Sequence, residues 1–338
     1  MVTIKDIAKM AGVSAMTVSN VIHNRETKTS EMTRNTILEL IHKHNYKPNM
    51  FARNLVIGKS KIIGLLIPNV SNPFYSTLIR VVEDAANQAG YGVFLCNTHN
   101  NMGLELNYIR IMKENCVDGL IVASSTINNT DYYNTLARES FPVVIMDRLI
   151  RDEEDVYSVI SDDFKGSYTA VQHLIEKGHR RIGCIVGTLT TLNSSERLRG
   201  YNEAMLDQKL PIESSWVHTG NDSLEMGATA TDVLLKSKVT AIMTCNDILA
   251  YGVYRKASEL KLHIPLDLSV IGFSDISFSE IITPPLTTVR LPILEMGIQA
   301  TELLFGLLDH KTWNQKTFSY QTNFIIREST AQPSSTSR

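Results

Sequence analysis

The residues best suited to chemistry in this sequence are polar side chains that directly follow short apolar segments. Asp147 and Arg148 follow the apolar run 143–146, while Asn246 and Asp275 stand just after later runs of the same kind. Guanidinium, amide and carboxylate groups form directed hydrogen bonds with hydroxyls and ring heteroatoms. These residue types therefore predict the binding of a small polar molecule.

The sequence contains no complete catalytic or metal-binding motif among those that we compared with it. The segment 58–60 (GKS) imitates the end of a phosphate-binding loop, but Arg53 stands where that loop requires glycine, and the apolar strand follows the motif instead of preceding it. The segment 272–276 (GFSDI) lacks the last glycine of a nucleophile elbow, and HExxH is absent. We therefore expect no enzyme, no cofactor and no metal site.

Compartment and thiol chemistry follow from two further patterns. The chain shows no apolar segment of signal-peptide length at its start and no apolar run near the ~20 residues that cross a bilayer. We therefore expect a cytoplasmic protein and disfavour the alternative of a secreted sugar-binding protein.

The four cysteines are scattered along the chain beside apolar runs, which predicts buried, reduced thiols. They are Cys96, Cys116, Cys184 and Cys245.

Charge divides the chain into a basic head and an acidic body. Residues 1–61 hold ten Lys/Arg against four Asp/Glu, a net charge of +6, whereas the remainder holds 23 against 31, a net charge of −8. Basic side chains that contact phosphates release counterions and supply affinity for nucleic acid that does not depend on sequence. The head is therefore expected to bind a polyanion.

The head also has the pattern of a helix-turn-helix. The segment Thr3–Asp6 predicts a capping box that starts a helix, and Gly12 predicts the tight turn that ends it. Ser14 can cap a second helix over 15–22, and a third helix is expected from about Ser30. Because the second helix of such a motif enters the major groove by its N-terminal residues, we expect the head to bind DNA.

Beyond residue 61 short apolar runs alternate with helical segments. Two series of runs are present: 62–67, 93–96, 119–122 and 143–146, then 182–186, 216–219, 241–244 and 269–272. Strands that alternate with helices form parallel sheets with right-handed crossovers. The expected fold is therefore a small all-α helix-turn-helix headpiece followed by two α/β subdomains, each with a doubly wound parallel sheet.

The order of several motifs resembles the lactose/galactose repressor family of bacterial transcriptional regulators. The resemblance begins with TIKDIAKMAGVSAMTVSNVIHN and YKPNMFARNL, continues through IGLLIPNVSNPFY, VDGLIV, PVVIMDR and HLIEKGHRRIG, and ends with SERLRGY, TCNDILAYG, PLDLSVIGFSDI, TPPLTTVRLP and IREST. It runs from Thr3 to Thr330. The family implies a repressor, a two-subdomain fold like that of periplasmic sugar-binding proteins, a homodimer and a two-fold symmetric operator.

Carried over by position, the resemblance implies the residues that contact DNA. The residues that would contact DNA bases are Ala15, Met16 and Asn20, and Thr17 would bind a phosphate or a base. Most members have arginine where Asn20 stands; arginine suits guanine and asparagine suits adenine, so the operator sequence stays open. The remaining predicted contacts are Thr3, Ser14, Asn24, Arg53 and Leu55.

The segment 47–61 is implied to be a hinge. Pro48 would begin a short helix over 49–56, which is marginal alone because isolated helices below ~12 residues barely form in water. In the family this helix orders on DNA, and Leu55 matches the leucine that enters the minor groove and bends the duplex. Leu55→Ala is therefore expected to weaken operator binding and to leave effector binding intact.

The resemblance implies an effector site between the two subdomains, and this place agrees with the rule that open parallel sheets bind ligands beyond the C-terminal ends of their strands. A sugar or sugar derivative is the first choice, and a purine or nucleoside is the second. Whether the effector releases DNA or strengthens its binding stays open. The predicted core of the site is Phe74, Arg148, Arg197, Asn246 and Asp275, with Tyr75, Thr191, Asn193 and Asp222 as neighbours.

The expected organisation is a headpiece at 1–46, a hinge at 47–61 and an effector and dimerisation domain at 62–330. Within it, one subdomain would comprise 62–162 and 292–322, and the other 163–291 and 323–330. Residues 331–338 are expected to be a disordered tail without heptads, which argues against a tetramer. Allostery would link closure of the subdomains to the separation of the two hinge helices.

Overall fold

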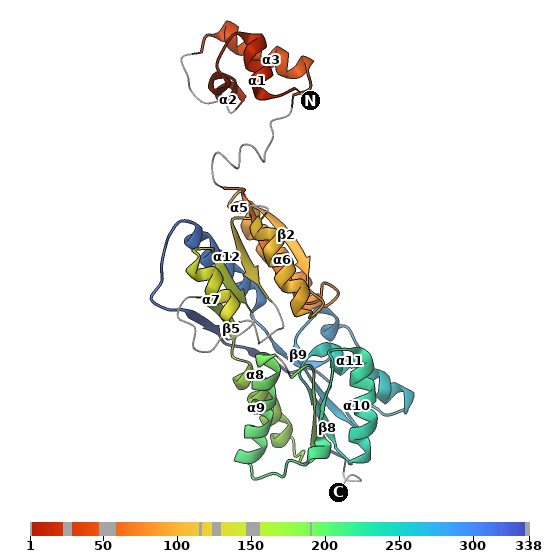
Figure 1. The fold of residues 1–338 in the computed structure, drawn as a ribbon. Helices are drawn as coiled ribbons and strands as arrows, with labels where there is room; N and C mark the ends of the chain where they lie inside the picture. Colours follow the sequence, from red (N-terminus) through yellow and green to blue (C-terminus); the bar gives the residue numbers. More distant parts are fainter. Residues whose placement is uncertain are drawn as a thin grey trace. The chain divides into compact units, whose positions relative to one another are not determined.

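The computed structural model describes residues 2–22, 29–46, 59–114, 117–123, 130–146, 156–189 and 191–334. The chain divides into two compact units, Met1–Ser60 and Lys61–Arg338, which we call the headpiece and the body (Figure 1). The predicted hinge helix over 49–56 lies outside the described residues.

Three helices form the headpiece: α1 (Ile4–Ala11), α2 (Ala15–Ile22) and α3 (Glu31–Lys43). Thr3 and Asp6 form the predicted capping box, and Gly12 ends α1 with a φ of 65°. The Ser14 Oγ accepts a hydrogen bond from the Thr17 amide at 3.1 Å, which starts α2. Ile7, Val18 and Ile37 are fully buried where the helices meet. The predicted helix-turn-helix headpiece is confirmed.

The first lobe of the body is a parallel sheet with the strand order β11-β5-β4-β3-β1-β2. Apolar residues of α5 and α12 pack on one face, and those of α6 and α7 pack on the other. The elements are β1 (Ile62–Ile67), α5 (Pro73–Gln88), β2 (Gly92–Asn97), α6 (Met102–Glu114), β3 (Gly119–Val122), α7 (Thr130–Arg138), β4 (Val143–Met146), β5 (Tyr157–Ser161), α12 (Ile293–Leu308) and β11 (Thr317–Tyr320).

The second lobe has the strand order β12-β10-β9-β8-β6-β7, in which only β12 is antiparallel to its neighbour among the described strands. Its elements are α8 (Asp163–Glu176), β6 (Ile182–Val186), α9 (Leu192–Asp207), η2 (Ser214–Trp216), β7 (Val217–Thr219), α10 (Leu224–Lys236), β8 (Ala241–Thr244), α11 (Asp247–Glu259), β9 (Ser269–Ser274), η3 (Ser277–Glu280), β10 (Thr287–Arg290) and β12 (Asn323–Ile325). Helices α8 and α9 lie on one side of the sheet and α10 and α11 on the other (Figure 1).

The chain passes between the lobes three times: from β5 to α8, from β10 to α12 and from β11 to β12. The predicted pair of doubly wound α/β subdomains is confirmed. The predicted strand at 216–219 begins one residue later, because Trp216 closes the 3-10 turn η2. The short strands β10, β11 and β12 were not predicted from the sequence, since each has only three or four residues and mixed polarity.

The C-terminal segment differs from the expected disordered tail at its beginning. The Ala331 amide donates to Ser269 Oγ at 3.0 Å, and its carbonyl oxygen lies 2.9 Å from His179 Nε2. Hydrogen bonds to the buried side chains of Ser269 and His179 hold this residue, so the packed body extends to at least Ala331. Residues 335–338 lie outside the described part of the chain.

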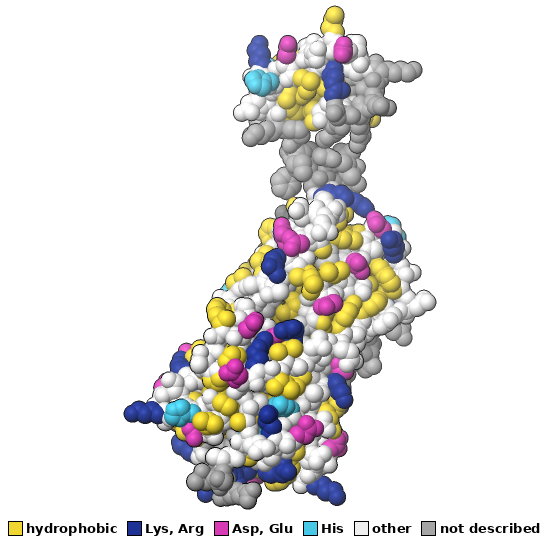
Figure 2. Space-filling view, turned by 180° about the vertical axis from the view of Figure 1, so that it is seen from behind, with side chains coloured by type: hydrophobic (Ala, Val, Ile, Leu, Met, Phe, Trp, Pro, Cys, Tyr) yellow, Lys and Arg dark blue, Asp and Glu magenta, His cyan; other side chains and the backbone are white. Residues whose placement is uncertain are grey.

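The surface of the body mixes both signs of charge with apolar side chains (Figure 2). Strand β2 stands at the edge of the first sheet, and its Phe94 and Leu95 are 51% and 39% exposed. Within the described residues, no helix is both long and apolar enough to cross a bilayer.

Candidate functional site

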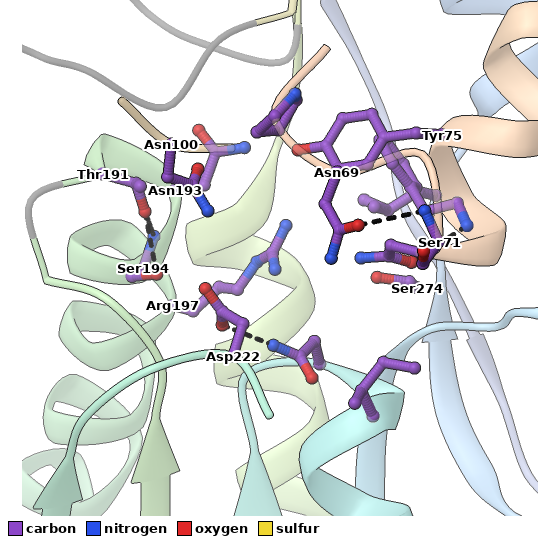
Figure 3. A pocket seen from close by; sticks show the side chains of 16 residues that line it. Asn69, Ser71, Tyr75, Asn100, Thr191, Asn193, Ser194, Arg197, Asp222 and Ser274 are labelled. Atoms are coloured by element: carbon purple, nitrogen blue, oxygen red, sulfur yellow. Dashed lines mark hydrogen bonds between the residues drawn. The ribbon is translucent and has the colours of Figure 1, made fainter. Parts of the chain in front are cut away.

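A cavity of about 300 Å³ opens between the two lobes of the body (Figure 3). It lies where the helices α5, α9 and α11 begin, at the C-terminal ends of strands in both sheets. The residues that line it are Pro68, Asn69, Ser71, Asn72, Phe74, Tyr75 and Asn100 from the first lobe, with Thr191, Asn193, Ser194, Arg197, Asp222, Asn246, Ile248, Ser274 and Leu291. Its volume is at the lower end of the range for small-molecule sites, which suits one small ligand.

Arg197 lies in the wall of this cavity and is held from several directions. Its Nη1 donates to the Cys245 carbonyl oxygen at 2.7 Å, and its Nη2 lies 3.2 Å from Asp163 Oδ1. The guanidinium carbon also stands 4.1 Å from the centre of the Phe273 ring. Burial raises the pKa of Asp163, and the charge of Arg197 opposes that shift. The guanidinium therefore has a fixed position before any ligand arrives.

Asp222 and Asn246 form a polar pair in the same cavity. The Asn246 Nδ2 donates to Asp222 Oδ1 at 2.6 Å (Figure 3). Asn246 Oδ1 accepts from the Leu249 amide at 2.9 Å and so caps α11. Loss of surrounding water raises the pKa of the Asp222 carboxyl, although Arg197 and hydrogen bonds from Thr188 and Asn246 lower it. An anionic acceptor and an amide are thus available to one ligand.

The aromatic part of the site comes from the first lobe. Phe74 and Tyr75 stand at the start of α5, with ring centres 4.9 Å apart and ring planes at 89°. Phe74 is buried and also belongs to the hydrophobic core of the second lobe. A ligand in the cavity therefore meets an apolar surface opposite the polar groups of the second lobe.

Strained backbone occurs on both sides of the cavity. His99 and Asn100 have φ values of 51° and 57°, and Ser274 and Asp275 have φ values of 115° and 52°. Asn100 and Ser274 both line the cavity. Residues other than glycine seldom adopt positive φ, and such strain concentrates at functional sites. Two turns that adjoin the cavity thus contain residues in this conformation.

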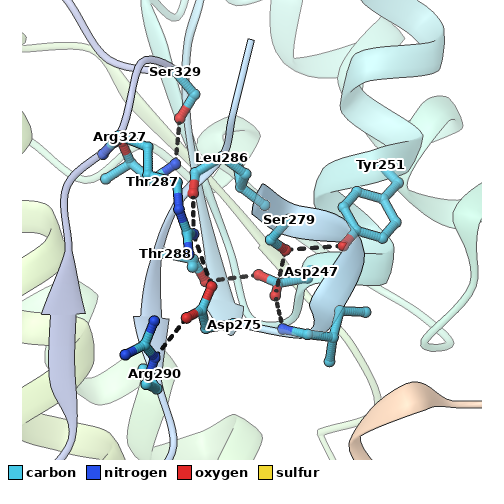
Figure 4. A network of polar contacts seen from close by, with 11 residues as sticks. Asp247, Tyr251, Asp275, Ser279, Leu286, Thr287, Thr288, Arg290, Arg327 and Ser329 are labelled. Atoms are coloured by element: carbon cyan, nitrogen blue, oxygen red, sulfur yellow. Dashed lines mark hydrogen bonds and ion pairs between the residues drawn. The ribbon is translucent and has the colours of Figure 1, made fainter. Parts of the chain in front are cut away.

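Asp275 is placed differently from the expectation, because it is not among the lining residues. Its carboxylate is 5% exposed and lies between two arginines, 2.6 Å from Arg290 Nε and 2.7 Å from Arg327 Nη1 (Figure 4). These ion pairs tie the turn after β9 to β10 and to the segment after β12. Of the other predicted effector residues, Arg148 lies outside the described part of the chain, and the remaining seven all line the cavity.

A second carboxylate, Asp247, is fully enclosed behind the cavity. Its Oδ2 accepts from the Ile276 amide at 2.9 Å and from Ser279 Oγ at 2.8 Å, and its Oδ1 accepts from Thr288 Oγ1 at 2.7 Å (Figure 4). Burial raises the pKa of Asp247 to about 6, against these hydrogen bonds, which lower it. Asp247 thereby connects the start of α11 with the strained turn after β9.

The headpiece presents a second candidate site on α2. Met16 is 71% exposed at the start of this helix, and Ala15, Thr17 and Asn20 are half-buried. Ser14 and Thr17 bond to each other, since their hydroxyl oxygens are 2.9 Å apart. Thr3 is occupied in the capping box with Asp6. The predicted contacts Asn24, Arg53 and Leu55 lie outside the described residues.

Family models match nearly the whole chain. Residues 3–49 match bacterial regulatory proteins of the lacI family, and residues 60–328 match the periplasmic binding proteins and sugar binding domain of the LacI family. The chain belongs to the LacI family of bacterial regulatory proteins. LacI-family membership confirms the resemblance found in the sequence.

Individual relatives agree with this assignment. The transcriptional repressors PurR of Photobacterium profundum and of Haemophilus influenzae are each 36% identical, over 97% of this chain and 98% of theirs. A LacI-family regulator from Enterococcus faecium with bound ribose is 31% identical, with a TM-score of 0.73 over 81% of this chain and all of that one. The Lac repressor dimer, bound to operator and an anti-inducer, shares the fold with a TM-score of 0.82 over 98% of this chain and 99% of that one, at 24% identity.

The chain is therefore a DNA-binding transcriptional repressor of the LacI family with a domain for a small-molecule effector. Nine lining residues were not predicted from the sequence: Pro68, Asn69, Ser71, Asn72, Asn100, Ser194, Ile248, Ser274 and Leu291. Ser274 ends β9 and Asn100 lies three residues after β2, so the rule that ligands bind beyond strand ends could have found both. Leu291 follows β10, which has no clear sequence signal.

Proposed function

We propose that this repressor is controlled by one sugar or sugar derivative, bound in the cavity between the two lobes. The single observation that carries the proposal is the convergence of Arg197, Asp222 and Asn246 opposite the Phe74–Tyr75 pair. Carboxylate and amide oxygens accept hydrogen bonds from hydroxyls, while guanidinium and amide N–H groups donate to hydroxyl oxygens. A cavity of about 300 Å³ with such a lining favours a monosaccharide-sized ligand.

The ribose-bound relative from Enterococcus faecium supports a sugar. A purine is the second candidate, because the Phe74–Tyr75 pair offers an aromatic surface on which a flat base could pack. Thr191 and Asn193 would complete the contacts from the start of α9. We expect Asp275 to act through the turn that carries Ser274, since both of its carboxylate oxygens already bind arginines.

On the headpiece, Ala15, Met16, Thr17 and Asn20 would face the major groove, because they lie at the start of the second helix of the helix-turn-helix. We further propose that the operator is bound by a homodimer, since two headpieces are needed for a two-fold symmetric site. The exposed Phe94 and Leu95 on the edge strand β2 would form part of the interface.

The effector proposal is tested by a thermal-shift screen of the full-length protein against common sugars and purines, followed by operator binding with each stabilising compound. A sugar should raise the melting temperature and change operator affinity. Asn246→Ser should abolish both responses, because serine can still cap α11 but lacks the amide. Asn87→Ser, at an exposed position near the end of α5, is the matched control. If only purines stabilise the protein, the sugar class is wrong.

A further inference from the structure

Asp222 places a carboxylate where the effector must bind. Asp222 follows β7 in the sequence, and its side chain lies against Gly187, which follows β6. A Cβ atom on Gly187 would lie only 1.8 Å from Asp222 Oδ1, so any other residue at this position would displace the carboxylate. The absence of a side chain at Gly187 therefore allows Asp222 to occupy this place beside Asn246.

Among the described residues, the positive charge of the cavity is already balanced. Among the described residues that line it, Arg197 carries the only positive charge. That guanidinium lies 3.2 Å from the buried carboxylate of Asp163 and stacks on Phe273. With Asp222 included, two carboxylates face one guanidinium. A further negative group in the cavity would meet no surplus of positive charge among these residues.

The helix starts around the cavity are capped by side chains of the chain itself. Asn72 Oδ1 accepts from the Phe74 amide at 3.0 Å, Thr191 Oγ1 from the Ser194 amide at 3.3 Å, and Asn246 Oδ1 from the Leu249 amide at 2.9 Å. A phosphate at a helix start is bound by such amides. Each cap occupies one of the donors that an anionic ligand would need.

We propose that Asp222 restricts the effector to an uncharged polyhydroxylated molecule and excludes the same molecule when it carries a phosphate or carboxylate group. Hydroxyls of a neutral sugar donate to the Asp222 carboxylate, whereas an anionic substituent is repelled by it. Burial raises the pKa of Asp222 because the ionised carboxylate loses surrounding water. Hydroxyl groups that donate hydrogen bonds to the carboxylate replace that water, so they would bind favourably. This inference rests on the proposed effector function and narrows its chemical class.

The test uses matched pairs on the full-length protein by isothermal titration calorimetry: D-ribose with ribose 5-phosphate, D-glucose with glucose 6-phosphate, and D-fructose with fructose 1-phosphate. We expect the neutral member of one pair to bind at least tenfold more tightly than its phosphate ester. Equal or tighter binding of the ester would refute this inference and leave the sugar effector standing. Binding of hypoxanthine alone, or of no compound, would refute both proposals.

Two variants connect the discrimination to Asp222. Asp222→Asn keeps the shape of the side chain and removes its charge, so the affinity ratio between the neutral sugar and its ester should fall at least tenfold. Gly187→Ala should act in the same direction by displacing the carboxylate. Asp232→Asn removes an equal charge from the outer face of α10 and should leave the ratio unchanged. Circular dichroism checks folding, and an unchanged ratio in folded Asp222→Asn would refute the assignment.

Discussion

Asp163 Oδ1 lies 3.2 Å from Arg197 Nη2, and both side chains are almost completely buried in the second lobe. Asp163 begins α8, and Arg197 lies in α9 with its guanidinium in the cavity wall. The ion pair joins the first crossing between the lobes to the wall of the cavity. A buried charge requires its partner, because desolvation leaves an unpaired ion strongly destabilised.

Asp163→Asn is therefore expected to lower the free energy of unfolding by about 3–5 kcal/mol, the usual effect of removing one member of a buried pair. Urea denaturation at pH 7 measures this change. Asp162→Asn is the control, because Asp162 caps α8 and asparagine caps equally well. Equal losses in the two variants would contradict a special role of the Asp163–Arg197 pair.

Substitution of Asn20 should change the operator preference. We expect Asn20→Ala to lose about 1–3 kcal/mol of discrimination at one base pair of each half-site, since a good bidentate contact contributes that much. Selection of binding sites from random DNA measures the preference. Asn35→Ala, at an exposed position on α3, should leave it unchanged. Unaltered selectivity in Asn20→Ala would remove this residue from the base-reading set.

Phe94→Glu should separate the proposed dimer. Phe94 is 51% exposed on the edge strand β2, and a charge in an apolar interface would have to be desolvated. We expect a monomer by light scattering at micromolar concentration and a loss of operator affinity. Leu206→Glu introduces the same charge on α9, where Leu206 is 58% exposed, and should leave the dimer intact. A dimeric Phe94→Glu protein would exclude this edge as the interface.

The buried Asp247 should make stability depend on pH. Its pKa of about 6 in the folded protein lies above the ordinary 3.8, so folding favours the protonated form. The stabilising contribution is present below pH 4 and is lost as the pH rises past 6, a change of roughly 3 kcal/mol.

Urea denaturation of the wild type and of Asp247→Asn at pH 4.5 and 7.5 tests this dependence. Asparagine does not titrate in this range. The unfolding free energy of Asp247→Asn should therefore increase relative to that of the wild type as the pH rises. Asp267→Asn, at a more exposed aspartate that bonds to His263, serves as the control. A constant difference between wild type and Asp247→Asn would show that Asp247 does not titrate in this range.

The sequence by itself determined the headpiece helices, the longer buried strands and the protein class. Helix starts were predictable because Thr3, Ser14 and Ser30 cap backbone amides three residues away, a local interaction. Buried strands were predictable because continuous apolar runs fit a sheet that is covered on both faces. The helix-turn-helix and the alternation of strands and helices followed from such local patterns, and so did the site segments at strand ends.

Only the tertiary structure decided which polar side chains line the cavity between the lobes. Asp275 was expected in the site, but Arg327, 52 residues away in sequence, binds its carboxylate. Arg197 is positioned by Asp163 and by the carbonyl of Cys245, and the place of Asp222 depends on Gly187. These contacts join residues distant in sequence, and their partners are set by the packing of the lobes. No local sequence pattern predicts that geometry, because each of these contacts forms only when distant parts of the chain have packed together.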